Sequence, residues 1–343
     1  MMCAHRSGRR LARLALTVLA PVLAIAGCAR DGGEAVAYSS VDQVFAEPVF
    51  REFEKVSGTR VRGVFDTEEA KSTGLLNRLI AEGNNPQADV FWSGDPVRAF
   101  VLIRRGLVQP YVSPNAATIP AQFKAADGSW TGFAARARVL LVNKNLVPAG
   151  SMPTSIRDLA NPRWKGQTAI ANPIFSTATM HVAALFTAWG DDSAKRFLDA
   201  LKANGIRVVS SNGEVKRLVA AGEVALGLTD TDDANEALKD GAPVEVVYPD
   251  QDGMGTLVMP TVAVLLERAP HADAGRRLID YLVSARSEEQ MARLAAHMPL
   301  GAGVPRVPGV RGVDQVRPMH VDYARVAETM ERIQPWLRRW VGL

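Results

Sequence analysis

The sequence of 343 residues is almost free of cysteine and poor in histidine. Its two cysteines, Cys3 and Cys28, lie near the start, so the chain after residue 28 cannot form a disulfide, a thiolate metal site or a cysteine nucleophile. No two of the five histidines form an H-x-x-x-H or H-E-x-x-H pair. No G-x-S-x-G elbow is present, and no G-x-G-x-x-G or P-loop motif follows a strand. The sequence therefore gives little support for most classes of enzyme.

The excess of positive charge is confined to the first 27 residues. They contain four arginines and no acidic residue, whereas the 36 remaining Lys and Arg match the 36 Asp and Glu. The net charge of +4 therefore gives no reason to expect nucleic-acid binding. With 47% hydrophobic and 22% charged residues, the full chain has the composition of a globular protein. The part after residue 27 is long enough for two domains.

No uncharged run near the start is long enough to span a membrane. Residues 14–26 are uncharged and follow a basic segment. This run is shorter than the ~20 residues of a spanning helix, but it fits the apolar centre of a secretory signal. The small residues before Cys28 resemble the lipobox of bacterial lipoproteins. We therefore expect residues 1–27 to be a signal peptide, Cys28 to be lipidated and residues 28–35 to form a tether.

Beyond residue 36, short apolar runs alternate with helical periodicity, which is typical of an α/β protein. Strands are expected at 36–38, 61–65, 89–92, 139–142, 169–171, 206–209 and 224–228, and a long apolar stretch follows at 256–266. Helical patterns are expected at 45–53 (stopped by Gly58), 75–80, 97–102, 177–189, 197–201, 215–221, 278–282 and 291–295.

Ligands of α/β proteins bind at the carboxyl ends of strands, so polar loops after strands are candidate sites. Four such loops carry the candidate residues Ser40, Asp42, Glu68, Asp95, Ser176, Thr177 and Ala178. Hydroxyls just before a helix can hold an anion together with the free backbone N–H groups. They can equally serve only as N-caps of that helix.

A fifth loop is acidic, and one strand start is basic. Asp230, Asp232 and Asp233 repel one another, which favours a cation, an ammonium group or a basic partner. The alternative is a solvated acidic helix start. Arg136 and Arg138 should share one face of a strand. They can clamp an anion or pair with the acidic loops.

Several segments match a known family in order and spacing: residues 38–45, 77–82, 86–92, 132–139, 162–166 and 253–258. With them the chain resembles the family 1 extracellular solute-binding proteins of ABC importers, in the iron(III)-binding branch. The resemblance implies an α/β, two-lobed periplasmic-binding-protein (type II) fold. Each lobe is then a mixed sheet flanked by helices, with a ligand cleft between the lobes. It places the N-lobe at 36–137 plus 256–300, the C-lobe at 138–255 and a C-terminal helical segment at 301–343.

The resemblance also implies site residues. It places an anion at Ser176, Thr177 and Ala178, with Asn212 and Asp230 near further anion-contacting positions. The tyrosine pair that binds iron in the family is replaced by Asp232 and Asp233. A histidine that some members carry after the first strand is replaced near Asp42. Carboxylates suit a hard cation, so Asp232 and Asp233 are candidate metal ligands. They could instead hold an ammonium group or hydroxyls of a phosphonate, phosphorylated sugar or other small organic anion.

The resulting prediction is a substrate-binding lipoprotein of an ABC importer of the ferric iron type. We expect a monomer at the periplasm or cell surface, with no cofactor and no nucleic-acid partner. Its ligand would be Fe³⁺ with an accompanying anion, delivered to the permease and ATPase subunits. Two alternatives stay open: an exported hydrolase that uses the carboxylates, and a ligand-sensing partner of a membrane receptor.

Overall fold

The computed structural model describes residues 33–66 and 74–343. The predicted signal peptide, Cys28 and the candidate residue Glu68 lie outside the described residues. None of the helices within the described ranges is long and apolar enough to cross a membrane. The strands are β1 (Glu34–Ser39), β2 (Arg60–Phe65), β3 (Val90–Ser93), β4 (Val108–Gln109), β5 (Thr131–Asn143), β6 (Thr168–Ala171), β7 (Arg207–Val209), β8 (Leu226–Asp230), β9 (Val244–Val247) and β10 (Val258–Leu266). The α-helices are α1 (Gln43–Ser57), α2 (Gly74–Glu82), α3 (Pro96–Arg104), α4 (Ser176–Trp189), α5 (Asp191–Ala203), α6 (Asn212–Ala220), α7 (Thr231–Lys239), α8 (Ala272–Leu282), α9 (Ala285–Ala295) and α10 (Tyr323–Val341).

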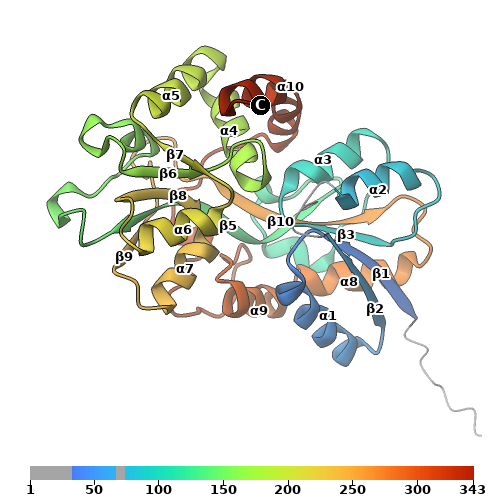
Figure 1. Ribbon diagram of the computed structural model, residues 1–343. Coiled ribbons are helices and arrows are strands. Elements are labelled where there is room, and N and C mark those ends of the chain that lie inside the picture. Colours follow the sequence, from blue (N-terminus) through green and yellow to red (C-terminus); the bar gives the residue numbers. More distant parts are fainter. Residues whose placement is uncertain (1–32, 67–73) are drawn as a thin grey trace, which may run out of the picture. The chain divides into compact units, whose positions relative to one another are not determined.

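The strands pair in the order β2-β1-β3-β10-β5-β8-β6-β7, with β4 on β10 and β9 on β5. Strand β1 runs parallel to β2 and β3, and β6 runs parallel to β7 and β8. We call β1–β4 and β10 with α1–α3, α8 and α9 the first half, and β6–β9 with α4–α7 the second half. Helices cover both faces of each half, with α2 and α3 opposite α1 and α8, and α4 and α5 opposite α6 and α7 (Figure 1). The mixed α/β fold is the predicted one.

Strand β5 connects the two halves. Its residues 131–137 pair with β10, and residues 138–143 pair with β8 and β9. The change of partner occurs at Arg138, so one connection between the halves passes through this residue. The backbone N–H of Arg138 donates to the carbonyl of Leu257 at 2.9 Å, so the segment that precedes β10 lies beside β5 here.

Two predicted elements need correction. Strand β5 begins eight residues before the predicted 139–142, because small residues and two arginines interrupt its first half and leave no long apolar run there. The segment 301–343, predicted as helical, contains only α10 and a short 3-10 turn, Val313–Gln315. Pro305, Pro308 and Pro318 explain the difference, because proline removes a backbone donor and disrupts helices.

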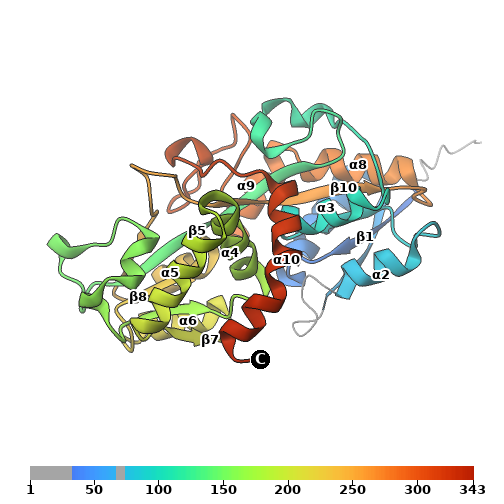
Figure 2. The ribbon, with the colours of Figure 1, turned by 90° about the horizontal axis from the view of Figure 1, so that it is seen from above.

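Helix α10 packs against α3 of the first half and α4 of the second (Figure 2). Glu331 accepts a hydrogen bond from Arg104 of α3 at 2.7 Å, and Arg332 pairs with Asp191 of α5 at 2.7 Å. The Trp336 ring contacts Phe186 of α4 with 5.5 Å between centroids. The C-terminal helix therefore bridges both halves.

Candidate functional site

A cavity of about 880 Å³ lies between the two halves. Ten of the thirteen predicted ligand-binding residues line it: Ser40, Asp42, Asp95, Arg136, Ser176, Thr177, Asn212, Asp230, Asp232 and Asp233. Arg138 and Ala178, two further predicted residues, are buried and line a smaller, mostly apolar pocket instead. The thirteenth, Glu68, lies outside the described residues.

The fold brings these residues together at strand ends. The segments β1–α1, β3–α3, β6–α4 and β8–α7 each connect the carboxyl end of a strand to the start of a helix facing the cavity. Close packing of α6 on β8 brings Asn212 beside Asp230. A Cβ on Gly227 would come within 2.8 Å of the side chain of Val219, so this approach requires glycine.

Asp230 is held by a dense network. Its carboxylate accepts hydrogen bonds from Arg138 at 2.6 Å, from Thr177 at 2.8 Å and from Asn212 at 3.2 Å. The side chains of Asp230 and Arg138 are 2% and 1% exposed. Burial opposes the charge, yet Arg138 and Arg136 outweigh it and lower the pKa of Asp230. Arg138 thus acts as the buried partner of Asp230, one of the two roles that its sequence position allows.

Asp232 and Asp233 lack such compensation. Burial, followed by repulsion from the neighbouring carboxylates, raises the pKa of Asp233 to about 8. Burial also raises the pKa of Asp232 to about 6, although Arg136 works against the shift. One oxygen from each of Asp230, Asp232 and Asp233 lies within 4.8 Å of the others, which is close enough to surround a metal ion. The cluster therefore has a deficit of positive charge.

Arg136 connects the acidic cluster to the opposite wall. Its guanidinium lies 3.5 Å from Asp230 and 3.6 Å from Asp232, in the second half. The same side chain donates to the carbonyl of Gly94 in the first half at 2.8 Å. Arg136 therefore contacts the acidic cluster of the second half and the backbone of the first half at the same time.

Three of the helix starts lining the cavity have no side-chain cap, whereas two others are capped. Asp95 accepts from the N–H of Val97 at 3.0 Å, and Ser211 accepts from the N–H of Glu214 at 3.1 Å. No side-chain hydrogen bond caps α1, α4 or α7. Ser176, the first residue of α4, also has φ of 52°, an uncommon backbone conformation for serine. The α4 start therefore keeps N–H groups available for an anion.

Unsatisfied polar atoms concentrate at this cavity. Among the described residues, nine buried side-chain N or O atoms lack a hydrogen-bond partner. Four belong to residues that line the cavity: Arg136, Thr179, Asp232 and His297. Buried polar atoms without partners are rare, so their concentration indicates that a ligand supplies the missing contacts.

The sequence did not indicate all of the lining residues. Thr179 and His297 lie within or after helices, and Gln334 and Arg338 belong to α10. None of them is in a loop directly after a strand, so the rule that identified the other residues could not find them.

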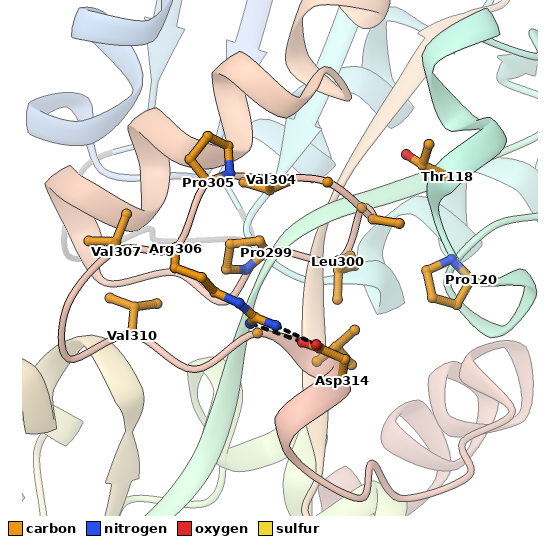
Figure 3. Close-up of a pocket in the computed structure, with 15 residues that line it drawn as sticks. Thr118, Pro120, Pro299, Leu300, Val304, Pro305, Arg306, Val307, Val310 and Asp314 are labelled. Atoms are coloured by element: carbon orange, nitrogen blue, oxygen red, sulfur yellow. Dashed lines mark hydrogen bonds and ion pairs between the residues drawn. The ribbon is translucent and has the colours of Figure 1, made fainter.

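A second cavity of about 430 Å³ lies elsewhere, beside the loop from Pro299 to Val307 (Figure 3). Its charged side chains, Arg306 and Asp314, pair with each other, with 3.0 Å between Arg306 Nη1 and Asp314 Oδ1. The remaining labelled lining is mainly proline and valine. This second cavity therefore has no counterpart of the undercompensated carboxylates Asp232 and Asp233 of the larger cavity.

Known proteins share this sequence and fold. A sequence model of bacterial extracellular solute-binding proteins matches residues 85–311. Iron uptake protein A1 of Synechocystis sp. is 30% identical over 280 residues, which cover 78% of this chain and 76% of that protein. The chain belongs to the bacterial extracellular solute-binding protein family.

This solute-binding protein has further relatives. A putative 2-aminoethylphosphonate-binding periplasmic protein of Salmonella typhimurium is 24% identical over 342 residues, covering 96% of this chain and 94% of that protein. Iron-bound HitA of Pseudomonas aeruginosa superposes with a TM-score of 0.79 at 22% identity, covering 90% of this chain and 99% of that one. The predicted family and the periplasmic-binding-protein (type II) fold are thereby confirmed.

The solute-binding protein has five tyrosines, and none of them lines the cavity of about 880 Å³. Tyr38, Tyr111 and Tyr323 donate instead to Glu82, Asp280 and the carbonyl of Val258. Phenolate ligands are therefore unavailable at this site. Its anionic oxygens come from carboxylates.

Proposed function

We propose that this protein is the substrate-binding subunit of an ABC importer of the ferric iron type. It captures its cargo in the cavity between the two halves and delivers it to a membrane permease driven by an ATPase. The observation that carries this proposal is the group of Asp230, Asp232 and Asp233, whose oxygens converge while two of the three have raised pKa values. Such a cluster gains most from a bound cation.

Ferric iron suits this donor set. Carboxylate oxygens are hard ligands, and hard cations prefer oxygen. Asp230 is already neutralised by Arg138, which leaves Asp232 and Asp233 as the main metal ligands. The uncapped start of α4, with Ser176, would hold an accompanying anion that balances the trivalent charge. The naming of the Synechocystis relative as an iron uptake protein supports the same cargo.

The location and partners follow from the same role. Relatives in this family are periplasmic binding proteins, and the lipobox-like sequence before Cys28 supports a lipid anchor outside the cytoplasm. We propose a monomer, because two halves of one chain already enclose the cavity. We also propose that the protein has no enzymatic activity. Turnover of a ligand that is abolished in Asp232→Ala would contradict this and favour the hydrolase alternative.

A second candidate cargo is an aminophosphonate. One observation favours it: an acidic cluster and an uncapped helix start face the same cavity, which has no tyrosine in its lining. An ammonium group would pair with the carboxylates, and a phosphonate would bind at the helix start. The Salmonella relative, whose name refers to such a compound, matches nearly the whole chain.

Native mass spectrometry with metal analysis tests the proposal on protein purified without added ligand. A ferric ion near stoichiometry, with a rise in Tm on adding Fe³⁺ and phosphate, is the expected result, because a ligand that binds only the folded state stabilises it. A metal-free protein stabilised by 2-aminoethylphosphonate would favour the second cargo. No stabilisation by either would contradict the transport role.

A further inference from the structure

Helix α10 presents a polar stripe to the cavity that no part of the iron or anion site explains. Met330, Gln334 and Arg338 all line the cavity. Their spacing of four residues places them on one face of the helix. The adjacent face carries the buried side chains Ile333 and Leu337.

The stripe is held in place from both sides. Thr187 of α4 donates to Thr329 at 3.1 Å, and the ion pairs of Glu331 and Arg332 fix α10 to α3 and α5. Helix α10 therefore contacts both halves, and its stripe forms part of the cavity wall between them.

Arg338 offers free charge at this wall. Its side chain is exposed and has no hydrogen-bond or ion-pair partner among the described residues. Arg136 and Arg138, in contrast, are occupied by Asp230 and Asp232. A guanidinium presents five N–H donors in a fork that matches carboxylate and phosphate groups.

The size of the cavity points in the same direction. About 880 Å³ lies within the ~300–1,000 Å³ typical of sites that enclose whole organic ligands. A metal ion with one small anion needs only a fraction of this volume. The match to the family model ends at residue 311, before α10, so the stripe lies outside the matched region.

We propose that Gln334 and Arg338 form a subsite for a negatively charged group on the organic part of the cargo. The inference rests on the proposed transport function and narrows its substrate class to organic anions. The charged group is a carboxylate or a phosphonate. It belongs either to an organic chelator around the metal or to a metal-free organic cargo.

The test compares three probes by calorimetric titration: Fe³⁺ with phosphate, Fe³⁺ with citrate, and 2-aminoethylphosphonate. Arg338→Ala should weaken one of the two organic probes about tenfold, the effect of one lost hydrogen bond to a charged group. Its effect on Fe³⁺ with phosphate should stay below about twofold. Gln334→Glu, which places a negative charge in the stripe, should weaken the same probe.

Arg339→Ala is the matched control, since Arg339 is an exposed arginine on the same helix but does not line the cavity. Loss in the citrate arm identifies a chelator, and loss in the aminophosphonate arm identifies a metal-free cargo. The subsite is overturned if Arg338→Ala equals Arg339→Ala with both organic probes, or if it weakens the phosphate probe equally. These outcomes leave wild-type binding intact, whereas failure of the wild type to bind any probe overturns the transport function as well.

Discussion

Asp230, Asp232 and Asp233 lie at the start of one helix, yet the protein lowers the pKa of Asp230 and raises the pKa values of the other two. Asp230 receives hydrogen bonds from Arg138, Thr177 and Asn212, and its pKa lies below the ordinary value. The pKa values of Asp232 and Asp233 lie above it, at about 6 and about 8. One acid is satisfied within the protein, and two are left short of positive charge.

The difference separates structural from functional groups in the cavity wall. In a buried, hydrogen-bonded ion pair each charge offsets the desolvation cost of the other, and removal of one partner leaves the other charge uncompensated. Charges without enough partners reduce stability in the empty protein, and a bound cation restores it. The comparison predicts opposite consequences for substitutions only two or three residues apart.

Asp230→Ala should have the largest effect on folding. It leaves the buried guanidinium of Arg138 without its counter-charge, and breaking a buried pair in this way costs ~3–5 kcal/mol. Urea denaturation of the cargo-free protein measures the change in free energy of unfolding. Asp232→Ala is the matched control and should leave the stability unchanged or raise it, since it removes a charge that burial disfavours. Equal losses of unfolding free energy in both variants would show that the charges of Asp230 and Asp232 are compensated to the same extent.

The second prediction concerns pH. Because the pKa values of Asp232 and Asp233 are raised in the folded state, that state binds their protons more tightly than the unfolded chain. Their contribution to stability is therefore complete below about pH 4 and is lost as the pH rises through about 6 and about 8. Asp233→Asn should remove the upper part of this loss, so the variant gains stability over the wild type near pH 8 but not near pH 4.

Urea denaturation of both proteins across this pH range checks the sign. The same measurement on wild type with Fe³⁺ and phosphate should show a weaker pH dependence, because a bound cation favours the ionised carboxylates. A wild-type stability that rises steadily with pH in this window, or an unchanged slope in Asp233→Asn, would contradict a charge deficit at the cluster.

The sequence was informative about the acids but not about their difference. Strand and helix periodicity placed Asp230, Asp232 and Asp233 at one strand end, and the structure brings all three to the cavity. Which acid would be paired depended on Arg138, which lies 92 residues away in sequence. Adjacency in the chain does not carry this information, because the partner of a buried charge is set by strand pairing between β5 and β8.

The parts of the site that sequence reasoning missed share a physical reason. His297 follows α9, and Arg338 lies near the end of α10, so neither sits after a strand. Both reach the cavity through the packing of whole helices against the halves. Local patterns predict where helices form, whereas the position of a helix such as α10 depends on contacts such as Arg104 with Glu331, separated by 227 residues.

The smallest predicted effects concern two helix starts at the cavity, of which α6 has a side-chain cap and α4 has none. Ser211 caps α6 through the N–H of Glu214, so Ser211→Ala should cost about 1 kcal/mol of stability. Ser176 makes no capping hydrogen bond at α4, so Ser176→Ala should change the stability of the empty protein by less than ~0.5 kcal/mol. Binding should show the reverse order, because Ser176 lines the proposed anion site and the Ser211 hydroxyl already accepts a hydrogen bond within the protein. Titration with Fe³⁺ and phosphate should therefore show the larger loss of affinity in Ser176→Ala, and an equal loss in both variants would place the anion away from α4.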